Sequence, residues 1–239
     1  MKESTYIKYS TVVEKHIIPK LGECYPLGFT TELMDDFIKE LQIEDELAPK
    51  TVHDILVVLH GILKFTASKV TGNFPVVEIN YPKIGKKEMR VLSREEQERF
   101  ISYLQNDLDP CRFGILLALC TGIRIGELCA LRWECVSTRD KAIKIVETLQ
   151  RLRDTSISQN ARTRIVIGPP KSDTSVRTIP MTEYVAGLCR YMKPQSSAAY
   201  VLTGTDAFME PRVLQYRLEK YTQACGLEGV NFHTLRHTF

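Results

Sequence analysis

The chain has 239 residues and a formal net charge of +3. This length allows one or two domains with a buried core, and the charge is too small to mark a nucleic-acid binder by composition alone. The seven cysteines are scattered and never spaced as C-x-x-C, which argues against a disulfide framework and a zinc site. The start lacks the apolar stretch of a signal peptide, and no run approaches the roughly 18 apolar residues that span a bilayer. We therefore expect a protein of the reducing cytoplasm that does not enter a membrane.

The charged residues are unevenly distributed. The segment 32–46 is strongly acidic, whereas the segments 50–90 and 151–177 carry concentrations of Lys and Arg. Two separate basic surfaces would suit a phosphate backbone that is held from two sides. Ordinary solvated surfaces would explain the same charges equally well, so charge alone leaves the partner open.

The first eighty or so residues have the apolar periodicity of helices. A stripe from Tyr6 to Ile17 that includes the tyrosine at position 9 predicts a first helix, and Pro19 and Gly22 end that segment. A second helix should follow Thr30, and a third, longer one should follow Pro49. These stripes predict the core of a small helical bundle and say nothing of function by themselves.

A segment of turn formers and like charges, 80–87, has no periodicity and is typical of an exposed linker. The part of the chain that follows opens with capping-box spacing at Ser93–Glu96, which predicts a helix start. A further apolar helix runs from Phe113 to Thr121 and stops at Gly122. We expect a domain boundary in the linker.

The pattern then becomes extended. Alternating β-branched residues over Ala142–Leu149, Arg162–Ile167 and Val176–Ile179 predict a small antiparallel sheet. Helices return at Thr182–Met192 and Pro211–Cys225. The predicted fold is therefore α+β and mainly α, with an all-helical N-terminal bundle followed by a mixed domain.

Two short islands lie more than a hundred residues apart: Thr121-Gly122-Ile123-Arg124-Ile125-Gly126-Glu127-Leu128 and His233-Thr234-Leu235-Arg236-His237-Thr238-Phe239. Together with Leu131-Arg132-Trp133, they resemble the arginine boxes of the tyrosine recombinases, also called the phage integrase family. The segment near the start also resembles the core-binding domain of integrases from mobile elements. The resemblance implies site-specific DNA recombination or integration, in which strands are cut and rejoined through a 3′-phosphotyrosyl intermediate.

The resemblance also implies a division of the chain. Residues 1–82 would form a helical core-binding domain that holds DNA, 83–91 a basic linker, and 92–239 the catalytic domain. The two domains of the family close as a C-shaped clamp around duplex DNA.

By the same resemblance, Arg124 and Arg236 bind the phosphate that is attacked. A guanidinium stays charged and donates two parallel hydrogen bonds to phosphate oxygens, so a pair of arginines suits a pentacovalent phosphate. His233 would contact the phosphate and handle protons, although capping or packing of a helix is the alternative. Glu127 lies one helical turn from Arg124 and could hold its guanidinium, or only complement the helix dipole. We expect His237 to be structural.

The turn Pro170-Lys171-Ser172-Asp173-Thr174-Ser175-Val176-Arg177 is similar to the family's hairpin pattern, with Ser172 in place of a threonine. The resemblance makes Lys171 the general acid for the leaving 5′ oxygen. A lysine in a turn is usually only solvated, and the two arginine boxes are what favour the catalytic interpretation.

None of the ten tyrosines follows Arg236, where the family has its nucleophile. Tyr216 and Tyr221 precede the second box, and we expect them to complete the apolar stripe of a helix. We therefore expect a recombinase fragment, truncated before the nucleophile, that binds DNA without cleaving it. The alternative is a non-catalytic DNA-binding protein that occupies sites or modulates a full-length recombinase.

The family needs no cofactor and no metal, because the tyrosyl linkage conserves the energy of the phosphodiester. Its partners are double-stranded DNA and, when full length, other protomers in a synaptic complex. Because the family's C-terminal tail often docks on a neighbouring protomer, we expect this chain to be monomeric without DNA. Strong binding to duplex DNA that depends on salt would exclude a helical interaction module unrelated to DNA.

Overall fold

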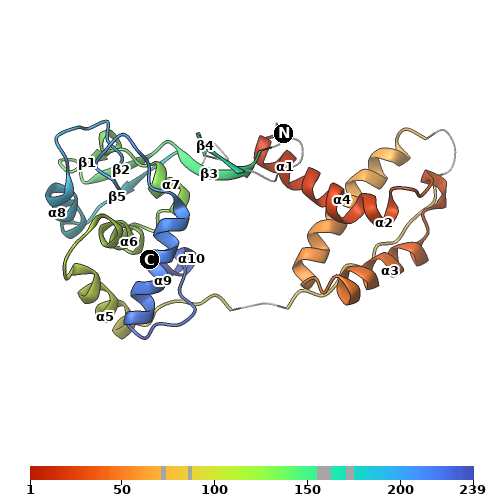
Figure 1. The fold of residues 1–239 in the computed structure, drawn as a ribbon, viewed down its shortest axis with the longest axis horizontal. Helices are drawn as coiled ribbons and strands as arrows, with labels where there is room; N and C mark the ends of the chain where they lie inside the picture. Colours follow the sequence, from red (N-terminus) through yellow and green to blue (C-terminus); the bar gives the residue numbers. More distant parts are fainter. Residues whose placement is uncertain (71–73, 86–87, 155–162, 171–174) are drawn as a thin grey trace. The chain divides into compact units, whose positions relative to one another are not determined.

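The structure, a computed structural model, describes residues 1–70, 74–85, 88–154, 163–170 and 175–239. It divides into two compact units, the first within Met1–Lys87 and the second beginning at Glu88 (Figure 1). No helix of the described residues is long and apolar enough to cross a membrane. The assignment of core-binding and catalytic roles to the segments 1–82 and 92–239 stays a prediction.

The first unit is helical, as predicted. Its helices are α1 (Glu3–Val12), α2 (Ile18–Leu21), α3 (Thr31–Lys39) and α4 (Pro49–Ala67). Helix α3 begins where the sequence indicates, because the Thr30 hydroxyl accepts a hydrogen bond from the backbone N–H of Leu33 at 3.1 Å. A π-helical turn, Val13–Ile17, joins α1 to α2, so the helix continues through Pro19 and ends before Gly22. Pro19 lies in the first turn of α2, where its missing N–H is best tolerated.

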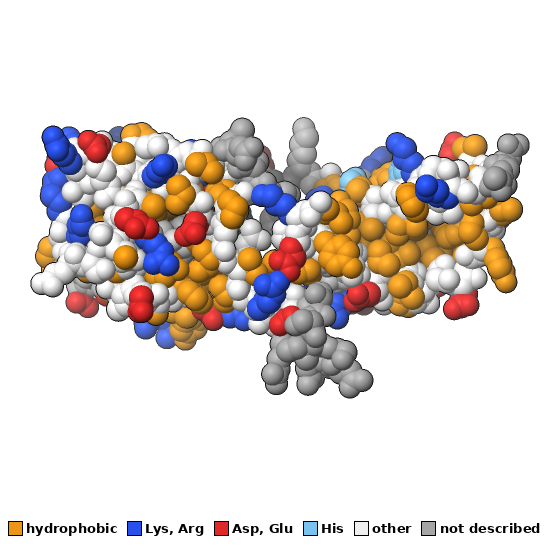
Figure 2. Space-filling view, turned by 90° about the horizontal axis from the view of Figure 1, so that it is seen from above, with side chains coloured by type: hydrophobic (Ala, Val, Ile, Leu, Met, Phe, Trp, Pro, Cys, Tyr) orange, Lys and Arg blue, Asp and Glu red, His pale blue; other side chains and the backbone are white. Residues whose placement is uncertain are grey.

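The stripe predicted for the first helix is partly wrong. Tyr6 and Tyr9 are 56% and 40% exposed, whereas Ile17 is buried as predicted, and Ile7, which lies outside the predicted stripe, is buried as well. A π-helical turn adds a residue to one turn and so shifts the face that the helix presents to the core. Apolar side chains outside α1, among them Ile62 and Phe65 of α4, are also exposed, and Figure 2 shows apolar side chains on the surface of this unit. The core itself is built mainly on α3, on the π-helical turn Glu40–Glu44 that follows it and on α4, around Met34 of α3 and Leu41 of the turn.

The second unit mixes helices and strands. Its helices are α5 (Arg94–Gln105), α6 (Pro110–Thr121), α7 (Ile125–Ala130), α8 (Glu183–Met192), α9 (Pro211–Ala224) and α10 (Phe232–Thr238). Its strands are β1 (Val136–Ser137), β2 (Ala142–Ile145), β3 (Thr148–Arg153), β4 (Thr163–Gly168) and β5 (Arg177–Pro180). The fold is mainly helical with small antiparallel sheets, which confirms the predicted class.

The strands form two sheets in the described part of the chain. The order β1-β2-β5 makes one antiparallel sheet, and β3 pairs with β4 in the other. The single strand predicted over Ala142–Leu149 is therefore wrong. Ile143, Ile145 and Leu149 are all buried, so the period of two continues through the bend between β2 and β3 and hides it from the sequence.

Caps place the helices that lead to the first arginine island. The predicted capping box at Ser93 and Glu96 is confirmed at the start of α5. Asp109 caps α6 by accepting hydrogen bonds from two backbone N–H groups. Helix α6 ends at Gly122, whose φ of +61° is the left-handed conformation that glycine adopts without strain. Helix α6 is buried almost all round, and α10 packs on it.

Helix α7 lies so close to β3 that its sequence is restricted at Gly126. A Cβ atom at this position would lie 2.6 Å from the backbone oxygen of Leu149 and 2.8 Å from the Thr148 hydroxyl. Neither distance is compatible with van der Waals contact, and the Leu149 oxygen belongs to a paired strand. The glycine between Arg124 and Glu127 therefore sets how closely this turn approaches the sheet.

We expect Gly126→Ala to destabilise the second unit by about 1–3 kcal/mol, because the added methyl group must push α7 away from β3. Gly187→Ala is the matched control, since a Cβ on this α8 glycine would meet only the end of the Arg190 side chain at 3.9 Å. In the control, helix propensity should raise stability by up to about 1 kcal/mol. Urea unfolding followed by circular dichroism measures both, and equal stability of Gly126→Ala and the wild type would contradict the close packing.

Candidate active site

The two arginine islands meet at the end of α6. Arg236 on α10 donates a hydrogen bond from Nη1 to the backbone oxygen of Gly122. Arg124 lies two residues further on, directly before α7. The bend at Gly122 thus points the carbonyl oxygen of this residue at Arg236 and leads the chain directly to Arg124. Segments that are more than a hundred residues apart in sequence are held together by this contact.

Helix α10 is fixed at both ends. Asn231 caps it, accepting hydrogen bonds from the backbone N–H groups of His233 and Thr234 at 2.9 and 3.0 Å. At the other end, the Thr238 hydroxyl accepts a hydrogen bond from the Leu92 backbone at 3.0 Å. Since Asn231 provides the cap, the His233 side chain is not needed for capping, and it lies exposed.

Glu127 forms the anionic centre of the site. Its side chain is only 3% exposed. Oε2 accepts from the Arg124 backbone N–H at 3.0 Å, and Oε1 accepts from Nη1 of Arg124 at 2.9 Å. In the first bond, the Glu127 side chain reaches back to the backbone of the residue before α7, as in a capping box, and the second bond holds the Arg124 guanidinium. The two interpretations offered for Glu127, a contact to Arg124 and a role at the helix start, therefore both describe its geometry.

Arg177, at the start of β5, is a site residue that the sequence does not single out. Its Nη1 and Nη2 donate to Oε1 and Oε2 of Glu127 at 2.9 and 2.8 Å, which is a bidentate pair. The signal available was its place at the end of the hairpin pattern, but spacing along the chain does not reveal a partner 50 residues away. Burial by itself would raise the pKa of Glu127, and the hydrogen bonds from Arg177 and Arg124 outweigh it, so the pKa lies below its ordinary value.

The site carries more positive than negative charge. Burial lowers the pKa of Arg236, and repulsion from Arg124 and Arg177 lowers it further, while Glu127 opposes the shift. A guanidinium remains charged at any relevant pH, so the repulsion is not relieved by loss of a proton. Arg177 and Glu127 form a pair of opposite charges, so the charge that remains, on Arg124 and Arg236, favours an additional anion.

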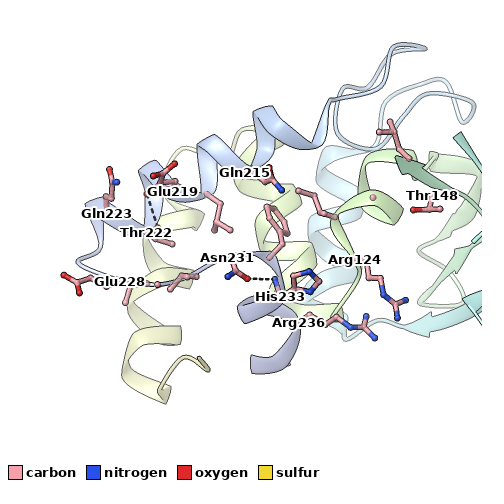
Figure 3. A pocket seen from close by; sticks show the side chains of 18 of the residues that line it. Arg124, Thr148, Gln215, Glu219, Thr222, Gln223, Glu228, Asn231, His233 and Arg236 are labelled. Carbon is pink, nitrogen blue, oxygen red and sulfur yellow. Dashed lines mark hydrogen bonds between the residues drawn. The ribbon is translucent and has the colours of Figure 1, made fainter. Parts of the chain in front are cut away.

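A cavity of about 1140 Å³ opens beside these residues. Arg124, His233 and Arg236 line it together at one end, and Glu219 and Glu228 lie at the other (Figure 3). Strand β3, helix α9, the start of α7 and the segment 227–232 contribute the rest of the wall. The cationic end of the cavity is formed by Arg124 and Arg236, with His233 beside them.

The structure brings together four of the five predicted site residues: Arg124, Glu127, His233 and Arg236. The fifth, Lys171, lies outside the described residues, as does Ser172. His237 is exposed, and the structural role expected for it stays a prediction.

The other motif residues are structural. Arg132 of Leu-Arg-Trp donates to the backbone oxygen of Ala198 at 2.7 Å and lies over the Tyr200 ring, 4.1 Å from its centroid. Trp133 stacks on Phe113 in the core. This third island therefore supports the scaffold and does not line the cavity.

None of the described residues that line the cavity is a tyrosine. Tyr221 is buried, as expected of an apolar stripe, and its hydroxyl donates to Asp109 at 3.1 Å. Tyr216 is exposed beside Lys220, which contradicts its predicted place in the stripe. Burial raises the pKa of the Cys129 thiol to about 12, which fits a small core residue and not a nucleophile.

We expect Glu127 to make stability depend on acid pH. Its pKa in the folded protein is lowered, so its stabilising contribution is complete above the unfolded pKa of about 4.3 and is lost as pH falls through the folded pKa. The difference in free energy of unfolding between the wild type and Glu127→Gln should be largest near about pH 7 and shrink as pH falls from about 5 to about 3. Urea unfolding at several pH values measures it. A constant difference would show that the carboxylate is not held ionised.

Comparison with known proteins gives the family. The phage integrase family matches residues 90–239, more than half of the chain. The ICEBs1 integrase of Bacillus subtilis is 20% identical over 99% of this chain and 65% of its own length. The tyrosine recombinase XerA of Thermococcus kodakarensis is 26% identical over 66% of this chain and 50% of its own length. The chain thus spans less than two thirds of the length of these curated relatives.

Solved structures agree with the fold. The integrase of the Tn1549 transposon, solved in complex with transposon right end DNA, superposes with a TM-score of 0.79 over 100% of this chain and 80% of that chain, at 20% identity. A lambda integrase dimer bound to a COC′ core site gives a TM-score of 0.64 over 100% of this chain and 81% of that chain, at 18% identity. With the family match over the unit that holds both arginine islands, these likenesses lead to one conclusion: the chain belongs to the phage integrase family, the tyrosine recombinases.

Proposed function

We propose that this protein acts in site-specific DNA recombination, as part of an integrase of a mobile element that cuts and rejoins strands through a 3′-phosphotyrosyl intermediate. The observation that carries the proposal is the convergence of Arg124 and Arg236 on one end of a cavity, held by the contact between Arg236 and the Gly122 carbonyl. The convergence of two arginines from distant segments on one end of a cavity suits one phosphate. The similarity of the chain to integrases and recombinases supports the same reaction.

In the proposed reaction, Arg124 and Arg236 hold the non-bridging oxygens of the scissile phosphate. Negative charge on these oxygens grows as the phosphorus becomes pentacovalent, so fixed guanidinium donors stabilise the transition state more than the ground state. Glu127, which is buried, holds the guanidinium of Arg124 in place. His233 lies exposed at the same end of the cavity, where an imidazole can contact the phosphate and exchange a proton. Lys171 would protonate the leaving 5′ oxygen.

We further propose that the 239 residues bind duplex DNA and do not cleave it. No described residue that lines the cavity is a tyrosine, and the two tyrosines of α9 are engaged elsewhere. The same observation favours a second candidate function, in which the protein occupies DNA sites or modulates a full-length recombinase without catalysis. The two candidates share the DNA-binding step and differ in whether a nucleophile reaches the phosphate.

The proposed partners are double-stranded DNA and, in a complete recombinase, other protomers. A neighbour solved as a lambda integrase tetramer on a Holliday junction has the same fold as this chain. We propose that the 239 residues alone are monomeric without DNA, and that they act in the cytoplasm. The DNA-holding role of residues 1–82 is part of the same proposal.

Removal of Arg124 or Arg236 should weaken DNA binding. Arg124→Ala and Arg236→Ala should each reduce affinity for duplexes from the ends of the source element roughly tenfold, because a hydrogen bond to a charged group contributes about 1.5–3 kcal/mol. Arg190→Ala is the matched control, since this exposed arginine of α8 pairs only with Glu183 among the described residues. Fluorescence anisotropy at several salt concentrations measures the affinities, and wild-type affinity should fall steeply with salt.

Two outcomes would contradict the proposal. If Arg124→Ala and Arg236→Ala bind as tightly as Arg190→Ala, the two arginines do not hold a phosphate. If the 239-residue protein forms a covalent adduct with nicked DNA, one of its own tyrosines is the nucleophile and the non-cleaving part of the proposal is wrong.

A further inference from the structure

We propose that Arg177 is a positioning residue of this site: it neutralises Glu127 so that Arg124 keeps donors free for the phosphate. The inference rests on the proposed function, because it concerns the same anion site. It assigns to Arg177 no contact with DNA. Its effect on the phosphate would pass entirely through Glu127 and Arg124.

The hydrogen bonds to Glu127 differ between Arg177 and Arg124. Arg177 binds both carboxylate oxygens, with Nη1 to Oε1 at 2.9 Å and Nη2 to Oε2 at 2.8 Å. Arg124 uses only Nη1 of its guanidinium, at 2.9 Å from Oε1. Among the described residues, Nε and Nη2 of Arg124 have no hydrogen-bond partner. Two donors therefore remain for an anion, which is the number that a bidentate contact to a phosphate needs.

Exposure separates the two arginines in the same way. The Arg124 side chain is 50% exposed and lines the cavity, whereas the Arg177 side chain is 26% exposed and does not line it. Arg177 also donates from Nη1 to the backbone oxygen of Ser175 at 3.2 Å. Its terminal nitrogens are therefore already engaged. Arg177 is placed to serve the carboxylate, and Arg124 is placed to serve a ligand.

The consequence of losing Arg177 follows from the burial of Glu127. A carboxylate that is 3% exposed must keep its charge paired or take up a proton. Without Arg177, Arg124 is the remaining arginine bonded to it in the described structure. Arg124 would then turn its guanidinium toward both oxygens of Glu127 and lose the donors that face the cavity. Loss of a residue outside the cavity would weaken the binding of an anion inside it.

Three arginines from three elements act on Glu127 in the described residues, and Glu127 also lines a second cavity together with Arg132, Glu134, Lys144 and Glu147. Arg124 precedes α7, Arg177 begins β5, and Arg236 lies on α10, where it interacts with Glu127 through the field alone. If Arg177 acts only through Glu127, its removal should have no effect once Glu127 is neutral. A double-mutant cycle between these two positions tests that coupling directly.

The probe is inorganic sulfate, which keeps its charge over the pH range used. It is titrated into the 239-residue protein while the Nε–Hε resonances of the arginine side chains are followed by NMR. The variants are Arg177→Met, Arg177→Lys, Glu127→Gln and the double variant Glu127→Gln with Arg177→Met. Arg190→Met removes the same charge from an exposed position and serves as the matched control. Thermal unfolding by circular dichroism reports whether each variant is folded.

We expect Arg177→Met to weaken sulfate binding about tenfold, the effect of losing a charge-assisted bidentate contact at Arg124. Arg177→Lys should bind with an intermediate affinity, because an ammonium keeps the charge but cannot pair both oxygens. In the Glu127→Gln background, Arg177→Met should change the affinity less than about twofold. Arg190→Met should bind like the wild type. If Arg177→Met does not fold, the effect of Arg177→Lys on sulfate affinity is compared in the wild-type and Glu127→Gln backgrounds instead.

Two results would overturn the inference while leaving the proposed function intact. One is wild-type sulfate affinity in Arg177→Met, provided that Arg124→Ala and Arg236→Ala lose binding. The other is an equal loss on removing Arg177 with and without Glu127, which would mean that Arg177 acts on the anion directly or through the field. If Arg124→Ala and Arg236→Ala bind sulfate as well as the wild type does, the proposed phosphate clamp fails together with the inference.

Discussion

A buried carboxylate is the constraint on which the rest of the site depends. Glu127 is removed from water, and its charge is stable there because Arg177 grips it from β5 and Arg124 holds it from the start of α7. The same bonds fix Arg124, whose outer face remains directed at the cavity. Removing one member of such a cluster leaves a buried charge unpaired, which costs more than one hydrogen bond. The site is therefore organised from its buried side outward.

Two glycines determine where this cluster lies. Gly122 adopts the left-handed conformation that ends α6, and its carbonyl receives Arg236. Gly126 lets α7, which carries Glu127, approach β3 closely. A side chain at either position would move one arginine relative to the other. Backbone geometry, more than the choice of charged residues, thus decides whether two distant islands can share a phosphate.

The sequence predicts the helices well where caps mark their ends, as at Thr30 and Ser93, because a cap is a local interaction. The prediction fails where the chain bends or a helix changes its winding but the local sequence pattern stays the same. The alternation of buried residues continues through the bend between β2 and β3, and a π-helical turn rotates α1 away from its expected stripe. The two arginine islands were recognisable by their local patterns. Arg177 was not, because the partner that gives it meaning lies 50 residues away along the chain and opposite it in space.

Covalent capture on a nicked suicide substrate tests the central claim most directly. The substrates come from the ends of the source element. The protein includes any residues that the source reading frame encodes after Phe239, and it is compared with Arg124 intact and as Arg124→Ala. The account predicts a covalent protein–DNA adduct with Arg124 intact and a large loss with Arg124→Ala, at equal DNA occupancy. Equal adduct formation by both proteins would contradict the arginine clamp. No adduct from either, on DNA that both demonstrably bind, would favour a DNA-binding protein without catalysis.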